Sequence, residues 1–199
     1  YNKPKSYTPK FLADKILKSK STIEGERKYV TVLFADVANY TTMAEKLDPE
    51  DVHRIMDGCF KILINDIHEH RGTINQFTGD GVMALFGAPL ALEDHAQDAC
   101  LAALAIQKAI KRYSRGLETK YGLNFQMRIG LNSGEVVVGS IGDDLRMDYT
   151  AIGDTTNLAA RMESLAKPGT VIVSPKTYKK IAQQFELKSL GEAEVKGKE

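Results

Sequence analysis

From residue 29 onward, the hydrophobic and polar positions follow patterns that predict strands and helices in turn. Residues 29–37 are mostly apolar and β-branched, which is typical of a buried strand. Residues 48–72 begin with an Asp-Pro pair and further acidic side chains and end at a glycine, which are the usual signals of a helix start and stop. The apolar residues of this helix recur at helical spacing and predict one buried face: Val52, Ile55, Met56, Cys59, Leu63 and Ile67.

The middle of the chain predicts a hairpin and a second long helix. Residues 73–78 and 82–86 are strand-like, and the Gly-Asp-Gly sequence around Asp80 is a turn signal between them. Residues 93–115 are rich in alanine and leucine and predict the second helix.

Two strands at 125–134 and 135–142 follow, and the pair Ser133-Gly134 predicts a hairpin between them. The element order is then βαββαβ with one extra strand. This order predicts an α+β fold with a ferredoxin-like core and added strands and helices. The remaining predicted elements are a polar excursion, meaning a polar loop at residues 143–148, then a helix capped by Asp154 or Thr155, and a strand and helix within residues 170–185.

Composition narrows the class of protein. The 199 residues suffice for one domain with a substantial core, and the net charge of +1 argues against a surface that coats nucleic acid. Cys59 and Cys100 are too few for a disulfide framework, so we expect reduced, buried thiols in a cytoplasmic domain. We find no membrane-span or signal-peptide pattern and expect no membrane contact from this piece.

Residues 1–28 differ in composition from the rest because they are strongly basic with a short apolar stripe. Thr8 and Pro9 predict the start of a helix, followed by a turn near Gly25. We interpret 1–28 as a helical coupling segment that joins an upstream regulatory module to a catalytic domain at 29–199. The alternative is an N-terminal helix that packs on its own domain.

Two aspartates carry the first candidate chemistry. Asp36 ends the first strand and Asp80 lies in the hairpin turn, and these strands are neighbours in a ferredoxin-like sheet. The two carboxylates can therefore share one or two Mg²⁺ ions; the alternative is that both aspartates only stabilise turns. The backbone N–H groups of the segment after Asp36, residues 37–42, could cradle a triphosphate at a helix N-terminus.

Asn157 and Arg161 form the second group of candidate catalytic residues. They stand four residues apart and so share one face of the predicted helix. An amide beside a guanidinium suits a sugar oxygen and a phosphate that gains charge in the transition state. The alternative is an ordinary polar helix face.

Three segments together resemble the signature of class III nucleotidyl cyclases: FADVANYT, QFTGDGVMALFG and YTAIGDTTNLAARM. The resemblance extends from about Tyr29 to Lys198. It implies a catalytic domain that makes a cyclic nucleotide from a nucleoside triphosphate, by attack of the ribose 3′-hydroxyl on the α-phosphorus with loss of pyrophosphate.

The resemblance assigns a role to each candidate residue. Two Mg²⁺ or Mn²⁺ ions per site would be held at Asp36, Val37 and Asp80, and Asn157 and Arg161 would stabilise the transition state. The family's active sites form across an antiparallel homodimer, so a monomer would be inactive. The phosphate-binding residues implied are Asn39, Tyr40, Thr41, Arg146 and Lys196, with Lys198 as the alternative to Lys196.

The two residues that would recognise the base of the nucleotide, here called the base-reading pair, depart from the family pattern. Adenylyl cyclases usually have lysine where this chain has Gln76, and the partner position is Thr150. A glutamate at the first position would indicate GTP, and it is absent. A neutral amide can face either base, so Thr150 favours ATP while GTP stays open as a second substrate.

Four functions are considered. The complete residue set favours an active adenylyl cyclase. The first alternative is a catalytically silent, nucleotide-binding regulatory domain, and the second is a guanylyl or dual-specificity cyclase. A palm-type nucleotidyl transferase is the third, but its glycine-rich acidic hairpin is missing. Family members continue past the VKGK motif at 195–198 into a final strand, and this sequence stops at Glu199, so we expect that edge strand to be either truncated or missing.

Overall fold

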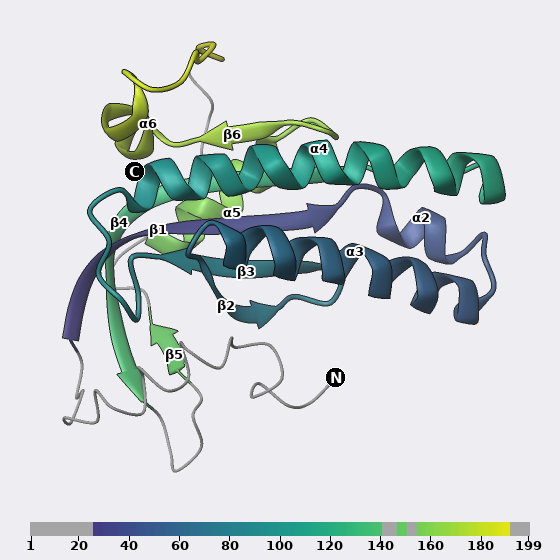
Figure 1. Ribbon diagram of the computed structural model, residues 1–199, viewed down its shortest axis with the longest axis horizontal. Coiled ribbons are helices and arrows are strands. Elements are labelled where there is room, and N and C mark those ends of the chain that lie inside the picture. Colours follow the sequence, from purple (N-terminus) through teal and green to yellow (C-terminus); the bar gives the residue numbers. More distant parts are fainter. Residues whose placement is uncertain (1–25, 141–146, 151–154, 192–199) are drawn as a thin grey trace.

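The computed structural model describes residues 26–140, 147–150 and 155–191, shown as a ribbon in Figure 1. The predicted N-terminal helix and the turn near Gly25 lie outside these residues. The elements in chain order are β1 (Glu26–Val37), α2 (Tyr40–Ala44), α3 (Pro49–Glu69), β2 (Thr73–Phe77), β3 (Gly81–Phe86), α4 (His95–Tyr121), β4 (Met127–Ser140), β5 (Met147–Thr150), α5 (Thr155–Leu165), β6 (Val171–Val173) and α6 (Pro175–Ile181).

The strands form a single sheet in the order β2-β3-β1-β4-β5, and β6 pairs with β4 in parallel while the other pairs are antiparallel. The helices α3 and α4 connect β1 to β2 and β3 to β4, so the inner order β2-β3-β1-β4 is that of a ferredoxin-like core. The predicted fold class is thereby confirmed. This strand order places the C-terminal end of β1 beside the turn between β2 and β3.

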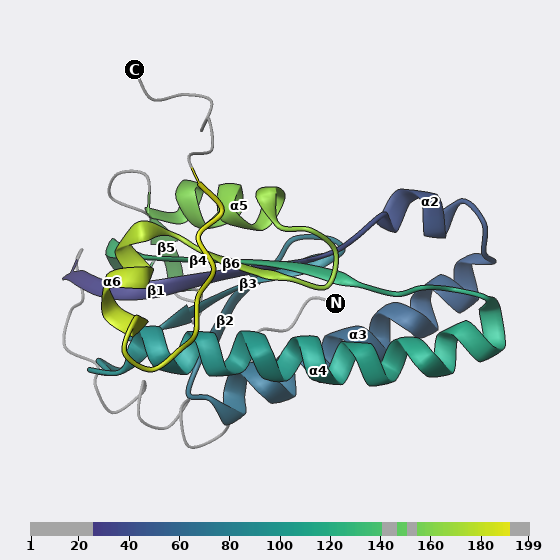
Figure 2. The ribbon, with the colours of Figure 1, turned by 90° about the horizontal axis from the view of Figure 1, so that it is seen from above.

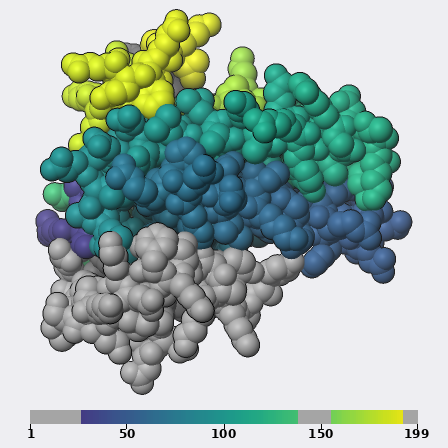
Figure 3. All heavy atoms as spheres, in the orientation of Figure 1, coloured from purple at the N-terminus to yellow at the C-terminus, as the bar shows by residue number. Residues whose placement is uncertain are grey.

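Helices cover both faces of the sheet. Figure 2 shows α3 and α4 on one face and α5 on the other, and Figure 3 shows α3 and α4 side by side on the outside. The larger core lies between the sheet and α3 and α4, and a smaller core lies under α5 around Ala159. The sheet thus separates the two long helices from the short helix that carries candidate site residues.

The helix predicted at 48–72 is confirmed as α3. Its buried residues are those predicted from the spacing: Val52, Ile55, Met56, Cys59, Leu63 and Ile67. Pro49 occupies the first turn, where its missing N–H costs nothing. Cys59 and Cys100 are free and buried, as expected, and burial raises the pKa of each thiol to about 12.

The hairpin predicted at Ser133-Gly134 is wrong. The strand β4 runs without interruption from Met127 to Ser140 because β1 pairs with it from Val37 back to Glu26. The glycine serves a close contact rather than a turn, since a Cβ at Gly134 would lie 2.6 Å from Thr155 Oγ1. The antiparallel neighbour that follows β4 in the chain is β5, in the segment predicted to be a polar excursion.

The second helix is longer than predicted. The helix α4 continues to Tyr121 and ends at Gly122, whose φ of 65° is the left-handed conformation common at helix C-termini. The first strand also begins earlier, at Glu26 rather than Tyr29.

Candidate active site

The two predicted aspartates meet at one end of the sheet. Asp36 is the penultimate residue of β1 and is paired in register with Gly81, the residue after Asp80. A Cβ at Gly81 would lie 2.1 Å from the carbonyl oxygen of Ala35, so only glycine lets the hairpin approach β1 this closely. Burial, together with the neighbouring Asp80 carboxyl, raises the pKa of Asp36.

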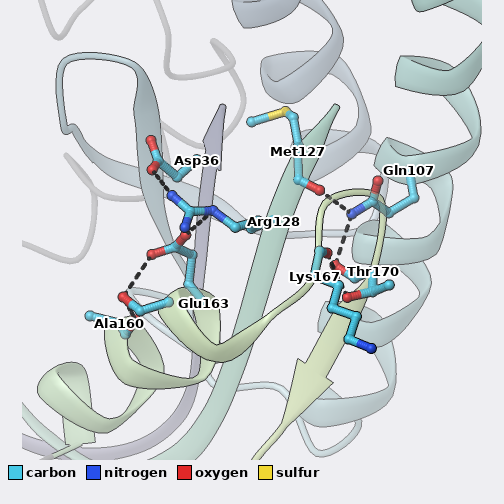
Figure 4. A network of polar contacts seen from close by, with 9 residues as sticks. Asp36, Gln107, Met127, Arg128, Ala160, Glu163, Lys167 and Thr170 are labelled. Atoms are coloured by element: carbon cyan, nitrogen blue, oxygen red, sulfur yellow. Dashed lines mark hydrogen bonds and ion pairs between the residues drawn. The ribbon is translucent and has the colours of Figure 1, made fainter. Parts of the chain in front are cut away.

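A guanidinium that the sequence interpretation missed lies beside this pair. Arg128 is opposite Asp36 on β4, and its Nη2 donates to Asp36 Oδ2 at 3.0 Å. Its Nε lies 3.1 Å from Glu163 Oε1 on α5, an ion pair without hydrogen-bond geometry. Figure 4 shows the Arg128 side chain between the two carboxylates. The available signal was an arginine within the otherwise apolar residues 127–131 that begin β4.

Glu163 is the third acid of this group. Only 11% of its side chain is exposed. Burial raises the pKa of its carboxyl, Arg128 opposes that rise, and the charges of Asp36 and Asp80 add to it. Asp36 and Glu163 therefore share one guanidinium, Asp80 adds a third carboxyl nearby, and full ionisation of the three leaves an excess of negative charge.

This donor set fits a divalent cation. Carboxylate oxygens are the ligands that Mg²⁺ and Mn²⁺ prefer, and a cation would relieve the repulsion between Asp36 and Asp80. Within the described part of the chain, no group of three His, Cys, Asp or Glu side chains is arranged as a metal cage. Mg²⁺ usually keeps several water or phosphate ligands, so two aspartates are a sufficient protein contribution.

The helix α5 presents its polar residues in two directions. Thr155, Ala159, Met162 and Glu163 are its buried residues, on the side that contacts β4 and β1. Arg161 is half-buried and Asn157 is exposed. Because Arg161 and Glu163 stand two residues apart, they point about 200° away from each other. Glu163 thus faces the acidic pair of its own chain, while Arg161 projects on the other side.

The predicted base-reading residues lie on two strands that touch. Gln76 is exposed on β2, directly after an irregularity in the pairing of β2 with β3 at residues 74–76. Thr150 is the last residue of β5 and pairs with Val137. The strands β2 and β5 lie at opposite ends of the sheet order and nevertheless contact each other.

The predicted phosphate-binding residues are only partly described. Val37 is buried at the end of β1, Asn39 is the N-cap of α2, and Tyr40 and Thr41 are the first two residues of that helix. Asn39 adopts the left-handed conformation with φ of 58°. Arg146, Lys196 and Lys198 lie outside the described residues.

Comparison with known proteins identifies relatives along most of the chain. Residues 24–199 match the family described as the adenylate and guanylate cyclase catalytic domain. Adenylate cyclase 1 of Rhizobium meliloti (strain 1021) is 36% identical over 174 residues, which are 86% of this chain and 26% of that protein. The chain therefore spans about a quarter of the length of that relative.

Solved structures agree with this similarity. The adenylyl cyclase CyaB of P. aeruginosa superposes with a TM-score of 0.81 at 32% identity, covering 87% of this chain and 90% of that one. The guanylate cyclase domain of RhGC from Catenaria anguillulae, in complex with GTP, gives a TM-score of 0.77 at 33% identity, covering 87% and 93%. Among the described residues, no helix is long and apolar enough to cross a membrane.

Proposed function

Because this chain belongs to the family of adenylate and guanylate cyclase catalytic domains, we propose that it converts ATP to 3′,5′-cyclic AMP and pyrophosphate. The observation that carries the proposal is the pair Asp36 and Asp80 at the end of the sheet, with a guanidinium within reach of it. This arrangement suits a reaction in which a hydroxyl is activated beside a polyphosphate.

Asp36 and Asp80, together with Val37, would hold two Mg²⁺ or Mn²⁺ ions. When bound, these ions would lower the pKa of the ribose 3′-hydroxyl and neutralise charge on the leaving pyrophosphate. In this proposal the ions activate the 3′-hydroxyl, and no side chain acts as a general base.

Arg128 has a role of its own in this proposal. Its guanidinium is held by Asp36 and by the poorly aligned contact with Glu163. A triphosphate oxygen accepts hydrogen bonds from guanidinium at least as well as a carboxylate does. Arg128 would therefore exchange its bond to Asp36 for a phosphate oxygen when substrate arrives.

The placement of Asn157 and Arg161 supports sites shared between two chains. They project from α5 on the side away from Glu163, which faces the acidic pair of the same chain. In an antiparallel homodimer, each chain would supply the aspartates of one site and the asparagine and arginine of the other. Arg161 would stabilise charge that develops on the phosphate, and Asn157 would orient the ribose.

Two other groups would complete the substrate site. The backbone N–H groups of residues 39–41, with Arg146 and Lys196, would bind the triphosphate. Gln76 and Thr150 would read the base, with Thr150 favouring ATP. Gln76 is a neutral amide, and the similar domain from Catenaria anguillulae is complexed with GTP, so guanylyl activity is the second candidate function.

The test is product formation by the purified protein with ATP or GTP, with Mg²⁺ or Mn²⁺, across protein concentration. We expect cyclic AMP, with a specific activity that rises with concentration because the sites form on dimerisation. Cyclic GMP as the only cyclic product would favour the second candidate. Nucleotide binding with no cyclic product would instead identify a regulatory domain and overturn the proposal.

A mixing experiment tests the shared sites directly. As homodimers, Asp80→Asn and Arg161→Ala should each reduce turnover about 100-fold or more, to a residual rate that can still be measured. Mixed in equal amounts, they should recover about a quarter of wild-type activity, because half the dimers are mixed and each holds one intact site. No recovery, with exchange of chains verified by mass spectrometry, would show that each site is built within one chain.

A further inference from the structure

The first residue of α5 is tied to β4 by a fully buried amide. Asn132, on β4, is 1% exposed, and its Nδ2 donates to the backbone carbonyl of Thr155 at 2.8 Å. Thr155 Oγ1 in turn donates to the carbonyl of Glu135 at 2.9 Å. Both the backbone and the side chain of the residue that starts α5 are therefore held on the same strand.

The orientation of the Asn132 amide follows from its partners. A carbonyl oxygen only accepts hydrogen bonds, so the NH₂ group must face Thr155 and the Oδ1 atom must face the other way. There Ser174 Oγ donates to Oδ1 at 2.6 Å. Ser174 is itself fully buried at the N-terminus of α6.

The amide is part of a longer chain of buried hydroxyl groups. Ser174 contacts Thr177 at 3.2 Å, Thr177 contacts Ser133 at 3.0 Å, and Ser133 contacts Thr31 at 2.8 Å. Thr31 is hydrogen-bonded to His95 Nδ1 at 2.7 Å. Buried polar groups are costly unless every one is paired, so this series of hydrogen bonds strongly disfavours rotation of the Asn132 amide.

We propose that Asn132 is a positioning residue for Asn157 and Arg161. The inference rests on the proposed function, because it concerns the transition-state residues of that reaction. These two residues follow Thr155 by two and six positions on one continuous helix. The bond from Asn132 sets the depth and rotation of the first turn, and α5 carries that placement to Asn157 and Arg161.

The test uses Asn132→Asp, which keeps the shape and the acceptor for Ser174 but sets an oxygen against the carbonyl of Thr155. We expect kcat for cyclic AMP formation to fall about tenfold while KM for ATP changes less than about twofold. Amide hydrogen exchange in residues 155–162 should accelerate. Asn124→Asp is the matched control, because Asn124 is exposed in the loop before β4 and should change neither quantity.

A double-mutant cycle separates positioning from simple loss of stability. If Asn132 acts through Arg161, Asn132→Asp should cost much less in the Arg161→Ala background than in the wild type. If Asn132→Asp reduced kcat by the same factor in both backgrounds and lowered the melting temperature, the proposal would be overturned. Should Asn132→Asp fail to fold, Ser174→Ala releases the amide from the other side and must show the same non-additivity in weaker form.

The two proposals fail in different ways. A wild-type protein that makes no cyclic nucleotide refutes the proposed function, and hydrogen exchange then decides about Asn132 without any turnover. Unchanged exchange in residues 155–162 of Asn132→Asp would show that this amide does not hold α5, whatever the enzyme's activity.

Discussion

Gly130 offers the sharpest test of how α5 is held. This residue lies on β4 directly beneath the helix, and a Cβ built there would be 2.0 Å from the backbone nitrogen of Glu163 and 2.5 Å from the carbonyl oxygen of Ala159. These are backbone atoms, which cannot turn aside as a side chain can. Gly130 is also paired with Phe34 on one side and Ile172 on the other, so the strand is restrained by both neighbours.

The size of the effect of Gly130→Ala follows from this geometry. Side-chain Cβ atoms do not approach other heavy atoms closer than 3.0 Å, so α5 must retreat by at least about 1 Å. Overpacking of this kind costs about 1–3 kcal/mol, which lowers the melting temperature of a chain this size by about 5 °C. A displacement of about 1 Å at Arg161 should reduce kcat about 100-fold.

The assay is thermal unfolding together with steady-state kinetics, with Gly116→Ala as the control. Gly116 lies on the exposed side of α4 with nothing within 4 Å of a built Cβ, so alanine there should add about 0.5–1 kcal/mol of stability and leave kcat unchanged. If Gly130→Ala kept the wild-type melting temperature and kcat, α5 would not depend on this close contact, and the argument for its placement would fail.

Three further predictions concern specificity, charge and pH. Gln76→Lys should raise the ATP/GTP ratio of kcat/KM about tenfold, because lysine only donates and guanine N1 carries a proton. Arg128→Met should destabilise the metal-free protein by about 2 kcal/mol by leaving Asp36 and Glu163 unpaired, and Mn²⁺ should restore more stability than in the wild type. His95 should make stability fall by about 2 kcal/mol from pH 7 to pH 5 in denaturant titrations. Burial, with Lys180 nearby, lowers the pKa of His95 to about 4 against a model-compound value of 6.5, so below pH 6.5 the unfolded chain binds the proton and the folded chain does not.

Each of these has an outcome that contradicts it. An unchanged nucleotide ratio would show that Gln76 does not contact the base. Equal Mn²⁺ shifts in wild type and Arg128→Met, measured in thermal melts without nucleotide, would separate Arg128 from the cation site. His95→Asn should remove its share of the pH dependence, and a slope unchanged by that substitution would assign the effect to other groups.

Local patterns in the sequence determined the helices and the acidic turn. The buried face of α3 follows from the spacing of its apolar residues, because a helix places positions three and four apart on one side regardless of what it packs against. The hairpin around Asp80 likewise follows from its glycines. The element order then sufficed to predict that Asp36 and Asp80 are neighbours, since the ferredoxin-like order has few alternatives.

Contacts between distant segments decided the rest. Ser133 and Gly134 are turn residues by local rules, yet β4 continues through them because β1, about 100 residues earlier, pairs along its whole length and because α5 needs the space that glycine leaves. Arg128 and Asn132 lie on β4 and Glu163 lies on α5, and nothing in their own neighbourhood in the sequence records which side chains they meet. Periodicity reports on residues a few positions apart, whereas the partners of a buried charge or amide are set only when the sheet and α5 close around them.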